Sequence, residues 1–160
     1  MLQFPGAGQC SEEIYIMRSY IKIFSVHTPW GIAYYFFLTS QHKERLELFT
    51  EIYLLIISHD PNVGIIYKNF RRIKHHPKAL AVLGIEDACK AYEYKEEKRH
   101  AENMLASFYI EKNVFEIPPV QFKEVKYINN IPDDALSDLA TNTSSYAMNK
   151  WVQKVRMFKR

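Results

Sequence analysis

The stretch that decides the predicted fold is Ile66–Gly84, I-Y-K-N-F-R-R-I-K-H-H-P-K-A-L-A-V-L-G. Its apolar side chains recur at helical spacing and form one stripe: Ile66, Phe70 and Ile73. Its basic side chains occupy the other side: Lys68, Arg71, Arg72 and Lys74. Pro77 cannot continue a helix, and Gly84 suits the left-handed residue that closes one. The sequence therefore predicts helices over 63–84, with a break at His76-Pro77 and one basic face.

The chain before this stretch predicts a helical N-terminal half. Ser11 is a suitable N-cap for a helix that would run to about Val26 and end ahead of Pro29. Residues 42–59 predict another helix, because several apolar side chains fall on one face at helical spacing: Leu48, Ile52, Leu55 and Ile56. Residues 1–10 are expected to form an extended arm.

Residues 23–41 contain no Asp, Glu, Lys or Arg. The segment has about the length that a transmembrane helix requires. His27, Pro29 and Gly31 dilute its hydrophobicity. Two interpretations follow: a candidate membrane span, or a helix that is buried or faces a partner.

The chain after Gly84 is where the sequence places strands. Residues 85–107 are rich in Glu, Lys and Ala, which favours helix, with strands over 89–95 and 104–111 as the alternative. Residues 120–128 alternate in part and predict a strand. Residues 129–147 are polar and predict a loop-like excursion.

The last apolar residues alternate over 151–158, which predicts an edge strand with a basic outer face. The expected fold class is therefore α+β, with a helical N-terminal half, a small antiparallel sheet in the C-terminal half, and long extended arms. Three regions follow from this fold class. Residues 1–41 form an arm and a helical segment, and residues 42–128 form a core domain with helices 42–59 and 63–84 followed by strands. Residues 129–160 form an extended excursion that ends in the basic strand.

The stretch Ile66–Gly84 also resembles a family of mitochondrial inner-membrane proteins. This family includes the Tim-twenty-one subunit of the presequence translocase and cytochrome oxidase assembly factor one. The matching residues are Ile66, Tyr67, Phe70, Ile73, Lys74, His76, Pro77, Leu80, Val82, Leu83 and Gly84. Phe108–Glu111 resembles a core strand of that family, and residues 23–41 lie where its members have one membrane span. The resemblance covers about a quarter of the chain.

The resemblance implies docking without catalysis and without a cofactor. The chain would be a supernumerary subunit or assembly factor of a respiratory-chain complex, on the intermembrane-space side of the mitochondrial inner membrane. Its partners would be other protein subunits, with lipid contact as a further expectation. The expected partner-binding residues are Tyr67, Lys68, Arg71, Arg72, Lys74 and Tyr109, and the expected structural residues are His76, Pro77 and Gly84.

Catalytic and metal chemistry find little support in the sequence. Catalytic candidates would be His76 with Cys89, or Glu96 with Glu97, but no spacing forces either pair together. The histidines that a metal or haem site would use do not share ligand spacing with an acidic residue: His75, His76 and His100. With 5 Gly residues, the chain also lacks the glycine-rich phosphate-binding motifs. Cys10 and Cys89 are either free thiols or one disulfide.

An RNA-binding structural subunit of a ribonucleoprotein, such as a mitochondrial ribosome, is the alternative function. It would use the basic residues of 68–78 and the basic C-terminal segment, with Trp151 and Phe158 as stacking groups. The net charge of +3 does not by itself indicate nucleic acid.

Overall fold

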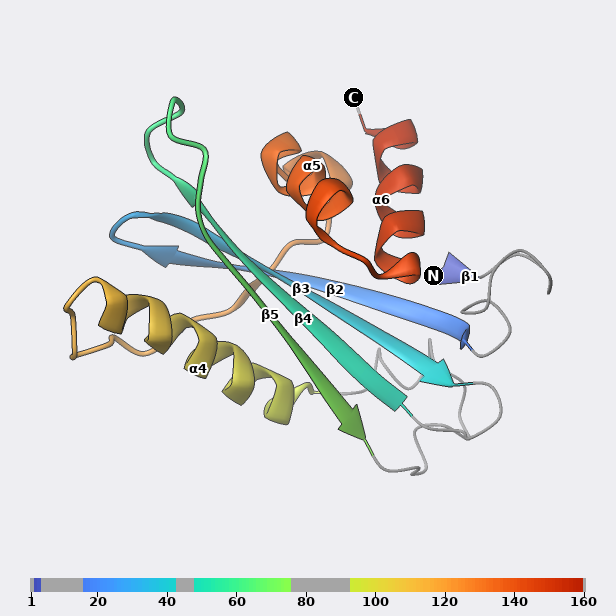
Figure 1. Cartoon of the computed structure of the whole chain (residues 1–160), viewed down its shortest axis with the longest axis horizontal. Coiled ribbons are helices and arrows are strands. Elements are labelled where there is room, and N and C mark those ends of the chain that lie inside the picture. The colour runs from blue at the N-terminus through green and yellow to red at the C-terminus, as the bar shows by residue number, and fades with distance from the viewer. Residues whose placement is uncertain (1, 4–15, 43–47, 76–92, 160) are drawn as a thin grey trace.

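A computed structural model describes residues 2–3, 16–42, 48–75 and 93–159 of the chain. Figure 1 shows three layers, with an antiparallel sheet between helix α4 on one face and helices α5 and α6 on the other. The strands are β1 (Leu2–Gln3), β2 (Ile16–Thr28), β3 (Gly31–His42), β4 (Leu48–Ser58), β5 (Ile65–His75) and β6 (Lys123–Glu124). The helices are α4 (Lys95–Glu111), η1 (Ile128–Asn130), α5 (Asp133–Asn142) and α6 (Tyr146–Phe158).

The sheet is a meander in which β2, β3, β4 and β5 pair antiparallel in chain order. The turn between β2 and β3 is tight, because the Thr28 hydroxyl accepts from the Gly31 amide at 3.1 Å and donates to the Gly31 carbonyl at 2.6 Å. Gly64, at φ 77°, closes the turn between β4 and β5. Pro29 therefore lies in a hairpin turn and does not mark the end of a helix.

Long strands suit this part of the chain because it is rich in β-branched and aromatic residues. In β4, successive side chains pack on opposite faces of the sheet: Ile52 and Leu54 against α4, and Tyr53 and Leu55 against α5 and α6. A strand covered on both faces is apolar throughout, without a polar side. The apolar run Ile52–Ile57 is therefore as compatible with a strand buried on both faces as with the buried helix that the sequence suggested.

The first face of the sheet is covered by α4. It lies over β4 and β5, and its buried side chains join the core on this face: Ala101, Met104, Leu105, Phe108 and Tyr109. Tyr35 on β3 donates a hydrogen bond to the carbonyl of Ala101 at 2.8 Å. Of the two alternatives left open for 85–107, the structure shows helix from Lys95 onward, while 85–92 lie outside the described residues.

The second face is covered by α5 and α6. Leu136 and Leu139 of α5 and Trp151 and Val152 of α6 are buried against Tyr34, Phe36 and Leu38 of β3. The connection from α4 reaches this face past the outer edge of β2, where β6 pairs with Phe24 and Ser25.

The predicted fold class is wrong in its order: the sheet lies in the N-terminal half and the helices in the C-terminal half. The helices expected over 11–26 and 42–59 are strands from Ile16 and Leu48 onward. The described part of the helices expected over 63–84 is the strand Ile65–His75, preceded by a turn. An apolar run that is buried on both sides carries no periodicity that separates helix from strand.

The candidate membrane span at 23–41 is a β-hairpin formed by the end of β2 and most of β3. It lacks charged side chains because the sheet is buried under helices on both faces. Within the part of the chain that the structure describes, no helix is long and apolar enough to cross a membrane.

The C-terminal predictions also need correction. The strand expected over 120–128 is confined to Lys123–Glu124, and the loop-like excursion at 129–147 contains η1 and α5. The basic edge strand at 151–158 is part of α6, because buried residues recur at helical spacing: Ala147, Met148, Trp151, Val152 and Val155. The N-terminal arm at 1–10 lies outside the described residues except for Leu2–Gln3, which pairs with β2.

Candidate docking groove

The two outer edges of the sheet differ. The outer edge of β2 is paired twice, with β1 at Arg18 and Ser19 and with β6 at Phe24 and Ser25. Among the residues that the structure describes, no strand pairs with the outer edge of β5. An unpaired edge presents a row of backbone N–H and C=O groups to whatever lies beside it.

Two hydrogen bonds show which amides of β5 point outward. The Ser58 amide donates to the Gly64 carbonyl at 2.8 Å, which sets the ladder between β4 and β5. The Phe70 amide instead donates to the Asn69 side-chain oxygen at 2.8 Å, on the open side of the strand. Outward and inward amides alternate in an antiparallel strand. The outward set therefore consists of Lys68, Phe70, Arg72 and Lys74.

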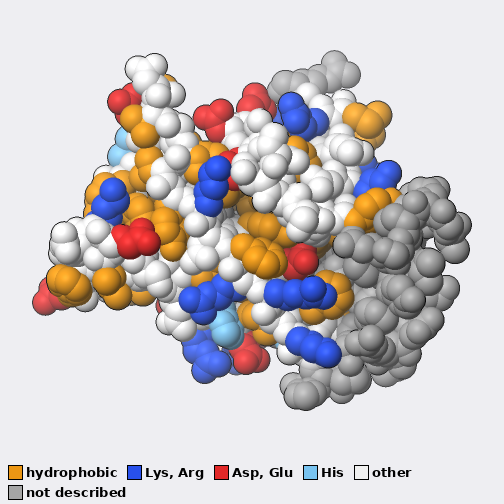
Figure 2. All heavy atoms as spheres, viewed as in Figure 1, with side chains coloured by type: hydrophobic (Ala, Val, Ile, Leu, Met, Phe, Trp, Pro, Cys, Tyr) orange, Lys and Arg blue, Asp and Glu red, His pale blue; other side chains and the backbone are white. Residues whose placement is uncertain are grey.

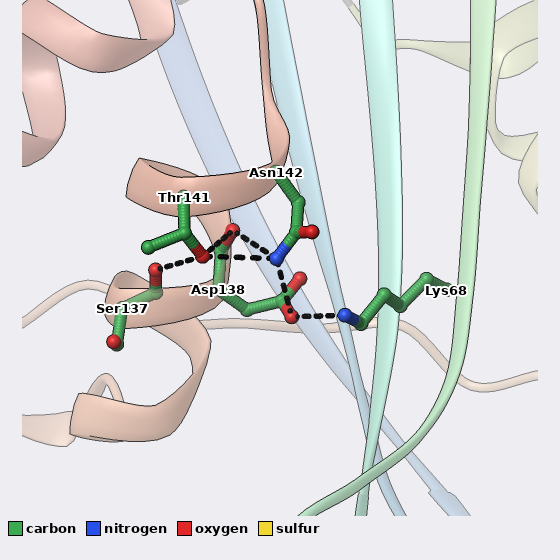
Figure 3. Close-up of polar contacts among 5 residues, drawn as sticks. All are labelled: Lys68, Ser137, Asp138, Thr141 and Asn142. Carbon is green, nitrogen blue, oxygen red and sulfur yellow. Dashed lines mark hydrogen bonds and ion pairs between the residues drawn. The ribbon is translucent and has the colours of Figure 1, made fainter.

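Beside this edge lies a groove of about 570 Å³ between β5 and the end of α5. We call it the β5–α5 groove, lined by Tyr53, Leu55, Lys68, Asn69, Phe70, Asp138, Leu139, Asn142, Thr143 and Ser144. Lys68 and Asp138 form an ion pair across it at 2.6 Å (Figure 3). The Asn142 amide donates to the same Asp138 oxygen at 3.1 Å, which holds the carboxylate toward Lys68.

The floor of the groove combines a buried hydroxyl with a half-exposed ring. The Tyr53 hydroxyl donates to Glu51 Oε1 at 3.1 Å and accepts from Thr143 at 3.0 Å. Burial, followed by the nearby Glu51 carboxylate, raises the pKa of Tyr53, so the phenol stays neutral. The ring of Phe70 lies 4.9 Å from that of Tyr53, yet Phe70 is 49% exposed. Phe70 is thus an apolar anchor available on the groove side of the edge.

The structure divides the predicted partner-binding residues between two faces. Lys68 and Arg72 lie on the α5 side of β5, where Lys68 pairs with Asp138 and Arg72 lies 4.2 Å from the Phe49 ring. Alternation places Lys74 on the same side. Figure 2 shows Lys and Arg side chains over β5 and the neighbouring start of α4. The basic surface expected of a helix is therefore carried by a strand.

The other predicted residues lie on the α4 side. The Tyr67 ring packs 4.7 Å from that of Phe108. Tyr109 is buried, with its ring 5.0 Å from that of Trp30. By alternation Arg71 shares this face with Tyr67. Tyr67 and Tyr109 therefore belong to the core beside α4, and the predicted structural residues His76, Pro77 and Gly84 lie outside the described residues.

A buried polar cluster joins α4 to the sheet. Glu97 is fully buried in the first turn of α4 and lies 3.0 Å from His75 and 3.3 Å from the Thr50 hydroxyl. Thr50 in turn contacts Thr39 at 3.1 Å. Such a cluster fastens the start of α4 to β4 and β5, because a buried carboxylate needs hydrogen-bond donors.

The catalytic candidates are not brought together as a pair. Glu97 is buried, while Glu96 points to solvent and pairs with Arg99 at 3.6 Å. The other proposed pair, His76 and Cys89, lies outside the described residues. Across the residues that the structure describes, no group of three His, Cys, Asp or Glu side chains is placed to hold a metal ion.

Sequence reasoning missed most of the groove. Tyr53, Asp138, Asn142 and Thr143 come from β4, α5 and the residue after α5. No local spacing connects them, since Lys68 and Asp138 are 70 positions apart in the sequence. One signal was available in the sequence. If Tyr67–Phe70 had been interpreted as a strand, the alternation of side chains would have placed Lys68 and Phe70 on the same face.

Comparisons with protein-family models, with curated proteins and with solved structures found no match to this chain.

Proposed function

We propose that this chain is a non-catalytic docking domain that binds an extended segment of a partner protein along β5. The observation that carries the proposal is the outer edge of β5, which no strand among the described residues pairs with and whose outward amides run beside the β5–α5 groove. Addition of a strand to an open sheet edge is a common way for a domain to bind a peptide. Main-chain hydrogen bonds would supply affinity, and side-chain contacts would supply selectivity.

The side chains around the edge support this mode of binding. Phe70 offers an exposed ring of the kind that anchors partner segments. The strand Ile65–His75 contains basic residues and no Asp or Glu, which favours partners with acidic residues and disfavours a second copy of the same strand. Asp138 already neutralises Lys68. Selectivity for acid would therefore come chiefly from Arg72, whose guanidinium lies over the Phe49 ring.

The cellular setting is a finer part of the proposal. An accessory or assembly role at the mitochondrial inner membrane rests on the resemblance of Ile66–Gly84. That family would place the segment in helices, whereas it is a strand up to His75, so only the residue pattern supports this setting. It stays a prediction, and co-purification of the chain with inner-membrane complexes would test it.

The RNA-binding alternative also stays a prediction. One of its two stacking groups, Trp151, is buried against Phe36 at a ring distance of 6.1 Å. The other, Phe158, is exposed. Stacking on both groups would require movement of α6, so the docking proposal is favoured.

Site-specific photo-crosslinking in cells would test the docking proposal. One variant carries benzoylphenylalanine in place of Phe70, and a matched control carries it in place of Phe115, which is 73% exposed and lies beyond the end of α4. We expect a discrete protein adduct at position 70 that is absent at 115. The adduct should weaken when Arg72→Glu is added.

Three results would count against docking at β5. These are no adduct at position 70, the same adducts at both positions, and an adduct at position 70 that ribonuclease removes. The last result would favour the RNA-binding alternative.

A further inference from the structure

Helix α6 carries an apolar stripe that continues past the part of the helix that is buried against the sheet. Ala147, Trp151 and Val155 are buried against the sheet and α5. Phe158 follows at the same helical spacing, yet it is 70% exposed. Met157 beside it is 80% exposed. The end of α6 thus presents two large apolar side chains to solvent. This end lies next to the C label in Figure 1.

Basic and apolar side chains meet at this end. Phe158 and Lys154 line a shallow hollow of about 360 Å³ together with Ile128, which is itself 41% exposed. Arg156 lies in the last turn of the helix and is exposed. We call this surface the α6 tip, defined by Ile128, Lys154, Arg156, Met157 and Phe158.

The charged residues that define the α6 tip, Lys154 and Arg156, are both basic. The sequence contains no Asp or Glu after Asp138. At the end of the helix, Asp133 forms an ion pair with Lys159 at 2.7 Å. Lys159 also donates a hydrogen bond to the Ile131 carbonyl, and the two contacts fasten the helix end. The hydrogen bond from Lys159 and its positive charge lower the pKa of Asp133. Lys154 and Arg156 are the other cations around the exposed apolar residues, and Arg156 is near enough to Asp133 to contribute to its lowered pKa.

We propose that the α6 tip binds the surface of an anionic lipid bilayer, inserting Met157 and Phe158 between headgroups flanked by Lys154 and Arg156. Exposed apolar residues with basic neighbours are what an interfacial membrane contact requires. Protruding side chains fit a deformable bilayer, whereas a protein partner would need a matching recess. Met157, the most exposed of them, has no ring on which a base could stack. The proposal does not depend on the function proposed for β5.

Vesicle flotation with the full chain tests this proposal. The probes are vesicles of phosphatidylcholine alone and vesicles that also contain phosphatidylserine, at low and physiological salt. We expect binding to the anionic vesicles, at least about tenfold weaker binding to the neutral ones, and weakening by added salt. Met157→Ser with Phe158→Ser, and separately Lys154→Glu with Arg156→Glu, should each reduce binding at least about tenfold.

Matched controls lie on α4 and the loop after it. Ile110→Ser with Phe115→Ser removes two other exposed apolar side chains, and Lys95→Glu with Arg99→Glu makes the same change of charge. Both should leave vesicle binding within about twofold, and circular dichroism confirms that each variant is folded. Absence of binding to anionic vesicles, or equal losses in tip and control variants, would overturn the proposal. Neither result would bear on crosslinking at Phe70.

Discussion

At the scale of single residues, Gly31 shows how closely the sheet is assembled. A Cβ atom at this position would overlap the carbonyl oxygen of Ile57 and lie 2.8 Å from its carbonyl carbon. Backbone atoms of a paired strand cannot move aside as a flexible side chain can. Gly31 is therefore required by the approach of β3 to β4, whereas Gly64 is required only by its backbone angle.

These two glycines give a matched prediction. Gly31→Ala should lower the free energy of unfolding by about 3 kcal/mol, because it forces β3 and β4 apart. Gly64→Ala should cost only about 1 kcal/mol, since its φ of 77° is strained for alanine but nothing lies within 4 Å of the added Cβ. Urea denaturation of both variants measures the difference. Equal losses would show that β3 and β4 are less closely paired than described.

At the scale of elements, the segment Ile66–His75 explains why the sequence misled. Its apolar residues Ile66, Phe70 and Ile73 match a helical stripe. In the sheet, a bulge opposite Ile56 and Ile57 shifts the register after Ile65. Ile66 and Ile73 consequently pack on the α4 side while Phe70 faces the groove. A bulge combined with strand alternation reproduced the spacing of a helix, and only the pairing with β4 distinguishes the two.

The direction of the β5 amides predicts opposite effects of proline at neighbouring positions. Arg72→Pro removes an outward amide and should leave the ladder with β4 intact, so the protein should fold with a modest loss of stability. Arg71→Pro removes an amide that bonds to β4 and should be at least about 2 kcal/mol more destabilising. Thermal unfolding monitored by circular dichroism compares them.

The two variants remove the same type of side chain, so loss of charge cannot account for a difference between them. If Arg72→Pro were the more damaging change, the outward set would be wrong. The proposed strand addition would then lack its hydrogen-bond donors.

At the scale of the whole molecule, composition and local pattern could predict a small α and β domain but not its layers. The helical propensity of 95–107 was visible in the sequence, and the structure has α4 there. The uncharged segment 23–41 suggested a membrane because burial under helices on both faces and burial in lipid leave the same composition. The contacts of Asp138 and Thr143 with β4 and β5 depend on the third layer, which no local pattern indicates.

The single sheet has a core on each face, and each core contains one of the two Trp residues. Trp30 packs 5.1 Å from Phe108 on the α4 side, and Trp151 packs 6.1 Å from Phe36 on the α6 side. Because adjacent residues of β3 such as Phe36 and Phe37 serve opposite cores, we expect both cores to unfold together. In Trp30→Phe and in Trp151→Phe, the fluorescence midpoint in urea should coincide with the midpoint by circular dichroism.

A mutation in one core should then be felt in the other. Met104 is fully buried on α4, so Met104→Ala should cost about 2–5 kcal/mol. In a Trp30→Phe background, the remaining fluorescence reports on Trp151. Met104→Ala should there lower the urea midpoint of the Trp151 fluorescence by as much as the midpoint by circular dichroism, although Met104 and Trp151 lie on opposite faces of the sheet. Ser107→Ala, at an exposed position on the same helix, is the control and should move neither midpoint appreciably.

If the urea midpoint of the Trp151 fluorescence did not change, the layer of α5 and α6 would fold independently of the layer of α4. The β5–α5 groove, which joins α5 to the sheet, would then be stable independently of α4.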